Sequence, residues 1–148
     1  MKILITGSIA YDYLMTFPGR FKEHLLPEHL EKVSLSFLVD GLVKRRGGIA
    51  PNIAYSLALL GGQSAIMATA GNDFTEYGEW LKRSGVDISE VRIIEDKLTA
   101  SFFATTDQTN AQIASFYPGA MQEAASLSLK DLKERHARNP PDGHHSGL

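Results

Sequence analysis

The sequence predicts an α/β fold, a doubly wound, Rossmann-like sheet with a small β-lid, and three observations lead to it. Short β-branched apolar segments at 2–6 and 63–70 are typical of strands buried on both faces. Helical stretches at 51–60 and 72–85 alternate with them along the chain. Hairpin signals near 40–41 and 107–110 indicate an additional antiparallel sheet.

Composition limits the classes of function. The chain has 148 residues, a formal net charge of −2 and a pI of about 6.2, which favours neither nucleic acid nor a membrane as partner. It contains no cysteine, which excludes disulfides, thiol catalysis and thiolate-bound metals. We expect a cytoplasmic protein without a metal site, and we interpret His136, His144 and His145 as tail residues rather than ligands.

The first part of the chain places a carboxylate near a strand end. The segment KILITG is predicted to be the first strand, and Asp12 follows in GSIAYDYL, just past its carboxyl end. Such a carboxylate can accept hydrogen bonds from a diol, or it can serve as a turn residue. Residues 17–32 are predicted to be a loop with a short helix, and 33–39 to pair with 42–46 across Asp40-Gly41.

The stretch RRGGIAPNIAYSLALLGG, residues 45–62, predicts a helix that begins near Pro51 and ends at Gly61 or Gly62. Glycines before a helix let a ligand approach backbone N–H groups, and Asn52 adds an amide in the first turn. One interpretation is a polyol or phosphate at the helix mouth, and the other is a turn with a local cap. The basic run at 44–46 is interpreted as a solvated lid edge, with a phosphate contact as the alternative.

The second part continues the alternation. A helix at 72–85 is predicted with Asn72 or Asp73 as its cap and an apolar stripe of Phe74, Tyr77 and Leu81. A strand at 91–95, a hairpin at 99–117 and a helix near 127–135 follow. The alternation stops on a helix, so we expect an unfinished sheet, from a truncated chain or a tail read out of frame.

The ordered set of GSIAYDYL, GGIAPNIAYSLALLGG, AGNDFTEYGEWLKRSGVDIS and TASFFATTDQTNAQIASFYPGAM resembles the N-terminal half of the ribokinase and adenosine kinase (PfkB carbohydrate kinase) family. The resemblance covers residues 1–133 and implies a ribokinase-like fold that is incomplete at the C-terminus. Lid elements would lie at 13–46 and 99–117, and 134–148 would be an atypical tail that we expect to be disordered. The family transfers the γ-phosphoryl group of ATP to a hydroxymethyl group of a sugar or nucleoside.

The resemblance also implies substrate-binding residues. Asp12 would bind the sugar hydroxyls, Gly47 and Gly48 would pass their backbone close to the sugar, and Asn52 would hydrogen-bond it. Phe116 and Pro118 would contact the base or sugar. The segment TTDQTNAQIASFYPGAM is most similar to the nucleoside kinases, with ribokinase or fructokinase specificity left open.

One departure from the family affects the expected activity. The family's DTxGAGD motif, which supplies the anion hole and the catalytic base, does not occur in this sequence. The absence of this motif therefore predicts that the chain has no catalytic residue and no activity alone. ATP and Mg²⁺ would be cofactors of the complete enzyme. A non-catalytic binding module is the alternative, and a redox Rossmann domain is disfavoured because no glycine fingerprint follows the first strand. A homodimer through the lid is a further expectation.

Overall fold

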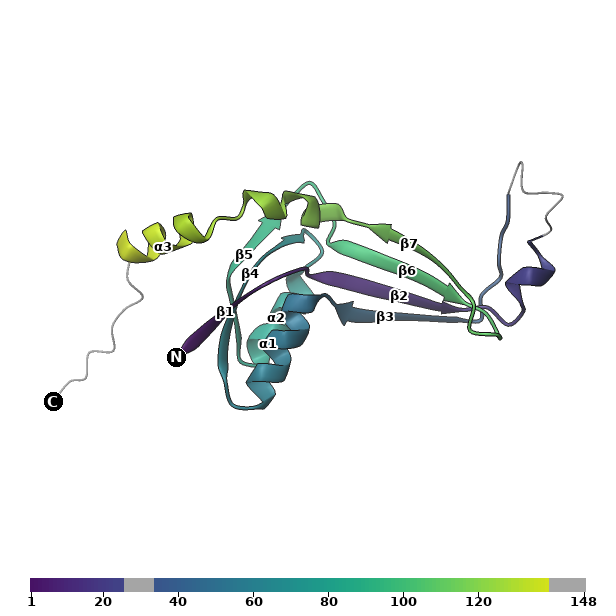
Figure 1. The fold of residues 1–148 in the computed structure, drawn as a ribbon, viewed down its shortest axis with the longest axis horizontal. Helices are drawn as coiled ribbons and strands as arrows, with labels where there is room; N and C mark the ends of the chain where they lie inside the picture. Colours follow the sequence, from purple (N-terminus) through teal and green to yellow (C-terminus); the bar gives the residue numbers. More distant parts are fainter. Residues whose placement is uncertain (26–33, 139–148) are drawn as a thin grey trace.

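The computed structural model describes residues 1–25 and 34–138, which form two sheets joined end to end (Figure 1). The first is a parallel sheet with the strand order β1-β4-β5. Helices α1 and α2 lie on one side of it, and η3 and α3 lie on the other (Figure 1). The bounds are β1 Lys2–Thr6, α1 Ile49–Leu59, β4 Gln63–Gly71, α2 Thr75–Arg83, β5 Val86–Ile94, η3 Gly119–Ser126 and α3 Leu129–Arg138.

Strand β4 is the centre of the core, and all of its residues after Gln63 are buried. Ile66 and its neighbours pack against an apolar stripe formed by Phe74, directly before α2, and by Tyr77 and Leu81 of α2, each at most 3% exposed. Ala50 and Ala54 of α1 complete this layer. The predicted buried strand and the predicted helix stripe are therefore confirmed, as is the α/β class with helices on both sides of the sheet.

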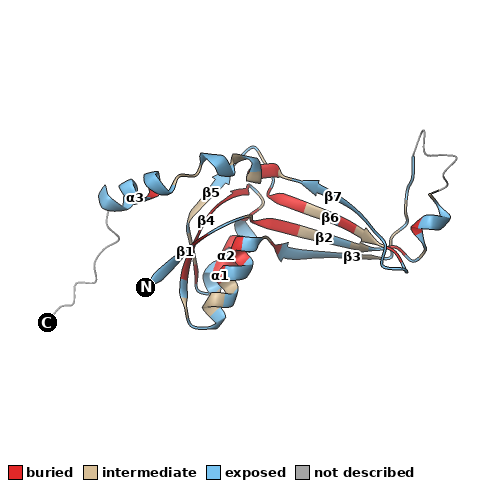
Figure 2. Ribbon diagram, viewed as in Figure 1, coloured by how far each residue is buried: buried red, intermediate tan, exposed pale blue. Residues whose placement is uncertain are grey.

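The second sheet is the lid, with the strand order β3-β2-β6-β7. Its strands are β2 Ala10–Thr16, β3 Gly41–Gly47, β6 Ala100–Thr106 and β7 Gln112–Tyr117. Strand β2 pairs in parallel with β6, while β3 and β7 are antiparallel to their neighbours. Burial is concentrated where β2 and β6 meet the core, and much of the rest of the lid is exposed (Figure 2).

Two predicted strand assignments are wrong. The segment 33–39 does not pair with 42–46: residues 34–39 form no strand, residue 33 lies outside the described part of the chain, and β3 pairs with β2 instead. Every residue of β3 matches one of β2, which leaves no place for a second partner on that side. Asp12 lies inside β2 and not directly after β1, because Gly7 to Ile9 interrupt the extended chain between the two strands. The predicted hairpin of β6 and β7 is confirmed.

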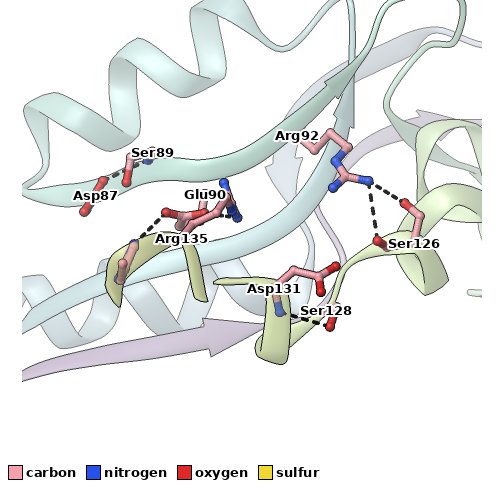
Figure 3. A network of polar contacts seen from close by, with 9 residues as sticks. Asp87, Ser89, Glu90, Arg92, Ser126, Ser128, Asp131 and Arg135 are labelled. Carbon is pink, nitrogen blue, oxygen red and sulfur yellow. Dashed lines mark hydrogen bonds and ion pairs between the residues drawn. The ribbon is translucent and has the colours of Figure 1, made fainter. Parts of the chain in front are cut away.

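Polar contacts attach the last described segment to the edge strand β5 (Figure 3). Glu90 accepts hydrogen bonds from Arg135 at 2.9 Å and pairs with His136 at 3.0 Å, and Arg92 donates to the Ser126 hydroxyl at 2.8 Å. Helix α3 runs to Arg138, past the predicted boundary at residue 133, and residues 139–148 of the predicted tail lie outside the described residues. No helix of the described residues is long and apolar enough to cross a membrane.

A buried carboxylate organises the far end of the lid. Asp107 accepts hydrogen bonds from the backbone of Phe21 at 2.9 Å, Thr109 at 2.7 Å and Ala111 at 2.9 Å, and from the Thr109 hydroxyl at 2.8 Å. Desolvation opposes ionisation, but these donors outweigh it and lower the pKa of Asp107 to about 2. Asp107 thereby ties the turn after β6 to the short helix η1, Phe21–Glu23.

The edge strand β1 predicts self-association of the isolated chain. Among the described residues β1 pairs only with β4, and Ile3 and Leu4 are 42% and 36% exposed. An unpaired apolar edge is a template for another strand, so we expect oligomers in size-exclusion chromatography with light scattering. Ile3→Lys should shift the chain toward monomer, while Leu59→Lys, which changes an exposed leucine of helix α1 outside both sheets, should not. A sharp monomer peak of the unsubstituted chain would contradict the prediction.

We predict that the contribution of the Asp107 carboxylate to the stability of the fold depends on pH. Its pKa in the folded chain, about 2, lies below the ordinary 3.8, so its contribution is full above pH 4 and is lost as pH falls toward 2. Asp107→Asn should lower the melting temperature at pH 7, because one oxygen acceptor is replaced by an NH₂ group. The difference from the unsubstituted chain should shrink between pH 4 and pH 2 in thermal melts followed by circular dichroism. A difference that is constant over this range would show that the carboxylate charge is not its cause.

Candidate functional site

Four residues form a row across one face of the lid. The register pairs Arg45 with Asp12, Asp12 with Phe102, and Phe102 with Phe116. Paired residues of neighbouring strands point to the same face, so the carboxylate of Asp12 shares its face with two aromatic rings. Asp12 is half-buried and Phe116 is 51% exposed. The predicted site residues Asp12 and Phe116 therefore lie on one open surface, together with Phe102.

Gly47 lies against Asp12. A side chain at residue 47 would place its Cβ 2.5 Å from the Asp12 Oδ2 atom, so the missing Cβ provides the space for the carboxylate. The backbone of Gly47 is held from the other side, because the Tyr77 hydroxyl donates to its carbonyl oxygen at 2.9 Å. Within the described residues, the carboxylate of Asp12 takes part in no hydrogen bond or ion pair. It is therefore available to accept from a ligand.

Gly48 marks the start of α1 in a left-handed conformation, with φ at 95°. The backbone donors that follow it are already used. Ser8 accepts from Ile49 through its hydroxyl and from Ala50 through its carbonyl, both at 3.2 Å. Pro51 has no N–H, and the N–H of Asn52 donates to the Gly48 carbonyl at 3.4 Å. The N–H groups of Ile49, Ala50 and Asn52 are therefore paired within the chain, and an anion at this helix mouth would have to compete with these contacts.

The other predicted site residues are less directly connected. Asn52 is exposed on the first turn of α1, and the described contacts contain no hydrogen bond between its side-chain amide and Asp12. Pro118 follows β7 and precedes η3, and it is partly exposed. The structure therefore places Asn52 beside the glycine pair and Pro118 at the base of the lid.

Asp73 has a role that the sequence did not indicate. Its Oδ1 atom accepts from the backbone N–H of Thr99 at 2.8 Å and from the Thr99 hydroxyl at 2.6 Å. Helix α2 begins without a side-chain cap, so the predicted capping role of Asn72 or Asp73 is wrong. The side chain of Asn72 instead donates to the Glu95 carbonyl at 2.9 Å. Both side chains therefore bind the connection between β5 and β6.

The sequence also did not indicate that Tyr11 and Tyr77 position the backbone behind the site. The Tyr11 hydroxyl donates to the Asp73 carbonyl at 3.1 Å, and the ring of Tyr11 packs on that of Tyr77 at 5.5 Å. Burial, followed by the charge of Asp73, raises the pKa of Tyr11 to about 12. Burial also raises the pKa of Tyr77. Both hydroxyls therefore stay protonated and remain donors at neutral pH.

Metal binding finds no support in this part of the chain. Residues 1–25 and 34–138 contain no group of three or more His, Asp or Glu side chains that could hold a metal ion. Among the described residues, the free polar group on the open face of the lid is instead the carboxylate of Asp12, which suits hydrogen bonding to a polyhydroxylated ligand.

Comparison with known proteins defines the class. The description "pfkB family carbohydrate kinase" matches residues 6–138, and the chain belongs to this family. It is 31% identical over 120 residues to the nucleoside kinase of Methanothermobacter thermautotrophicus, covering 80% of this chain and 36% of that protein.

Solved structures agree with this relationship. The nucleoside kinase of Burkholderia thailandensis in complex with inosine shares 42% identity with a TM-score of 0.69, covering 85% of this chain and 39% of that one. The nucleoside kinase of Methanocaldococcus jannaschii, an archaeal member of the ribokinase family, shares 28% identity with a TM-score of 0.71, covering 85% and 40%. The ribokinase-like fold is thus confirmed, and the chain spans about two fifths of the length of these relatives.

Proposed function

We propose that this chain is the acceptor-binding portion of an ATP-dependent kinase that phosphorylates a hydroxymethyl group of a nucleoside. The observation that carries the proposal is the carboxylate of Asp12, which has no partner among the described residues, lies against Gly47 and shares its face with Phe102 and Phe116. The carboxylate would accept from a pair of ribose hydroxyls, and the aromatic rings would pack on a flat base.

The two aromatic residues favour a nucleoside over a free sugar. A sugar alone would be recognised by the carboxylate and by amides such as that of Asn52, without a need for exposed rings. Phe102 and Phe116 are paired on neighbouring strands, so they form a continuous apolar strip that begins beside Asp12. Such a strip is large enough to cover a base attached to the ribose. Relatives named as nucleoside kinases, one of them in complex with inosine, support the same choice.

ATP and Mg²⁺ enter this proposal only through the complete enzyme. A related structure contains ADP and inosine, which supports the use of ATP by the family. The described residues offer no metal-binding cluster, and the N–H groups in the first turn of α1 are paired within the chain. The groups of this chain would therefore bind and orient the acceptor, while the chemistry of phosphoryl transfer would depend on residues outside it.

Substitution of Asp12 tests the binding site. Asp12→Ala should weaken binding of inosine and adenosine by about ten- to a hundredfold, because a hydrogen bond to a charged group contributes about 1.5–3 kcal/mol. Asn52→Ala should cost less, since no full charge is involved. Gly47→Ala should also weaken binding, because its Cβ would displace the carboxylate. Titration calorimetry with inosine, adenosine, ribose and fructose measures these effects.

A matched control separates binding from stability in this series. Asp40→Ala removes an exposed carboxylate from the lid, and it should change neither affinity nor melting temperature. If Asp12→Ala lowers the melting temperature but leaves nucleoside affinity unchanged, Asp12 is a structural residue and the proposal is wrong. Tighter binding of ribose or fructose than of either nucleoside would replace the nucleoside by a sugar as acceptor.

The isolated chain should transfer no phosphoryl group at a measurable rate. The sequence has no DTxGAGD segment, so it lacks the base and the preorganised anion site that this reaction needs. ADP release is measured in a coupled assay with ATP, Mg²⁺ and inosine, adenosine, ribose or fructose. The rate with each acceptor should equal the rate without acceptor. An acceptor-dependent rate that disappears in Asp12→Ala would overturn this prediction.

A further inference from the structure

A cleft lies behind strand β2, which carries Asp12. It has a volume of about 420 Å³ and is formed by β2, β3, α1 and α2. This volume is within the range of roughly 300–1,000 Å³ that is typical of small-molecule sites. Tyr11 precedes Asp12 in the same strand, so the two side chains leave opposite faces of β2. The cleft therefore lies on the reverse face of the lid, and Asp12 does not line it.

Aromatic rings cover one wall of this cleft. The Tyr55 ring from α1 lies 4.7 Å from the Trp80 ring of α2, and Trp80 lies 6.0 Å from Tyr77. Tyr77 in turn packs on Tyr11, so four rings from three elements form a continuous cluster. Tyr55 and Trp80 are only partly buried, which leaves ring surface open to a ligand. A flat ring can stack on such a surface.

Cationic groups line the same cleft. The Lys44 ammonium lies 3.9 Å from the centre of the Tyr11 ring, and the Arg46 guanidinium lies 5.0 Å from that of Trp80. Arg46 is paired with Glu76 at 3.2 Å, whereas Lys44 and Arg45 have no carboxylate partner among the described residues. Arg45 leaves β3 on the Asp12 face, so the reverse face carries two cations, Lys44 and Arg46, and one carboxylate, Glu76. The cleft therefore has an excess of positive charge in a chain whose net charge is −2. An anionic group is the complement of this surface.

From these two features we infer that the cleft binds a small anion with a flat ring, of the nucleoside monophosphate class. The phosphate would lie at Lys44 and Arg46, and the base would stack on Tyr55 and Trp80. The positive surface is confined to one short strand, which suits a single nucleotide rather than a nucleic acid strand. Lys44 and Arg46 of the basic run at 44–46 thus contact a phosphate, which is the alternative that the sequence offered to a solvated edge. This inference does not rest on the proposed function, because Asp12, Phe102 and Phe116 do not line the cleft, although Asn52 does.

The chain carries its own probe for this site, because Trp80 is its only tryptophan. Titration of the 148-residue chain with adenosine 5′-monophosphate should change the Trp80 emission in a saturable way. Adenosine and inorganic phosphate should each bind at least about tenfold more weakly, since adenosine lacks the phosphate and inorganic phosphate lacks the base. A single-stranded oligonucleotide that binds more tightly than the mononucleotide would overturn the choice of ligand.

Substitutions assign the binding to the cleft. The double variant Lys44→Gln/Arg46→Gln should weaken binding of adenosine 5′-monophosphate by about tenfold or more. The control Lys130→Gln/Lys133→Gln removes the same charge from exposed positions of α3 and should leave it unchanged. Asp12→Ala should also leave it unchanged, which separates this site from the nucleoside site. No change of Trp80 emission at millimolar ligand, equal affinity of the Lys44→Gln/Arg46→Gln variant, or loss of binding in Asp12→Ala would each refute the inference.

Discussion

The junction at Thr99 is the interaction on which the arrangement of core and lid depends. Its side chain is fully buried, and its hydroxyl both donates to Asp73 at 2.6 Å and accepts from the Gly71 N–H at 3.0 Å. Gly71 ends β4, Asp73 precedes α2, and Thr99 precedes β6. A Cβ at Gly71 would collide with the backbone at Leu98 and Thr99, so only glycine permits this approach. One hydroxyl therefore fixes where the lid leaves the core.

The two tyrosines extend this constraint to the candidate site. Tyr11 of β2 donates to the backbone of Asp73, so the same short segment holds both central strands of the lid. Tyr77 packs on Tyr11 and donates to the carbonyl of Gly47 at the end of β3. The position of Gly47 then determines the space left for the Asp12 carboxylate. The availability of that carboxylate thus depends on contacts made on the opposite face of the sheet.

The sequence predicted those parts of the fold that local periodicity determines. The buried strand β4, the stripe of α2 and the hairpin of β6 and β7 each lie within one short segment and were found. The pairing of β2 with β3 and β6 was not found, because it joins residues far apart in the chain and local pattern contains no information on register. For the same reason the resemblance could name Asp12 and Phe116, while only the register shows that they share a face.

The helix mouth illustrates the same limit at the level of single hydrogen bonds. Glycines before α1 predicted exposed N–H groups, but Ser8 accepts from Ile49 and Ala50. Ser8 lies in the connection from β1 to β2, and no local feature of residues 45–62 indicates this partner. The cleft behind the lid is a further case, since its rings and cations come from four separate elements. A cluster of this kind can be recognised only when the three-dimensional arrangement of the elements is known.

Strand register also explains how a carboxylate and a basic run coexist on neighbouring strands. Lys44 and Arg46 leave β3 on the face opposite to Asp12, while Arg45 lies across from it without forming an ion pair. A slip of β3 by one residue would move Lys44 and Arg46 to the Asp12 face and Arg45 away from it, so that two cations instead of one would share the face with the carboxylate. The edge strand β3 is held against such a slip at one end, where Tyr77 binds the Gly47 carbonyl and the left-handed Gly48 begins the turn into α1. The paired glycines and the tyrosine therefore preserve the separation of charge on which both faces of the lid depend.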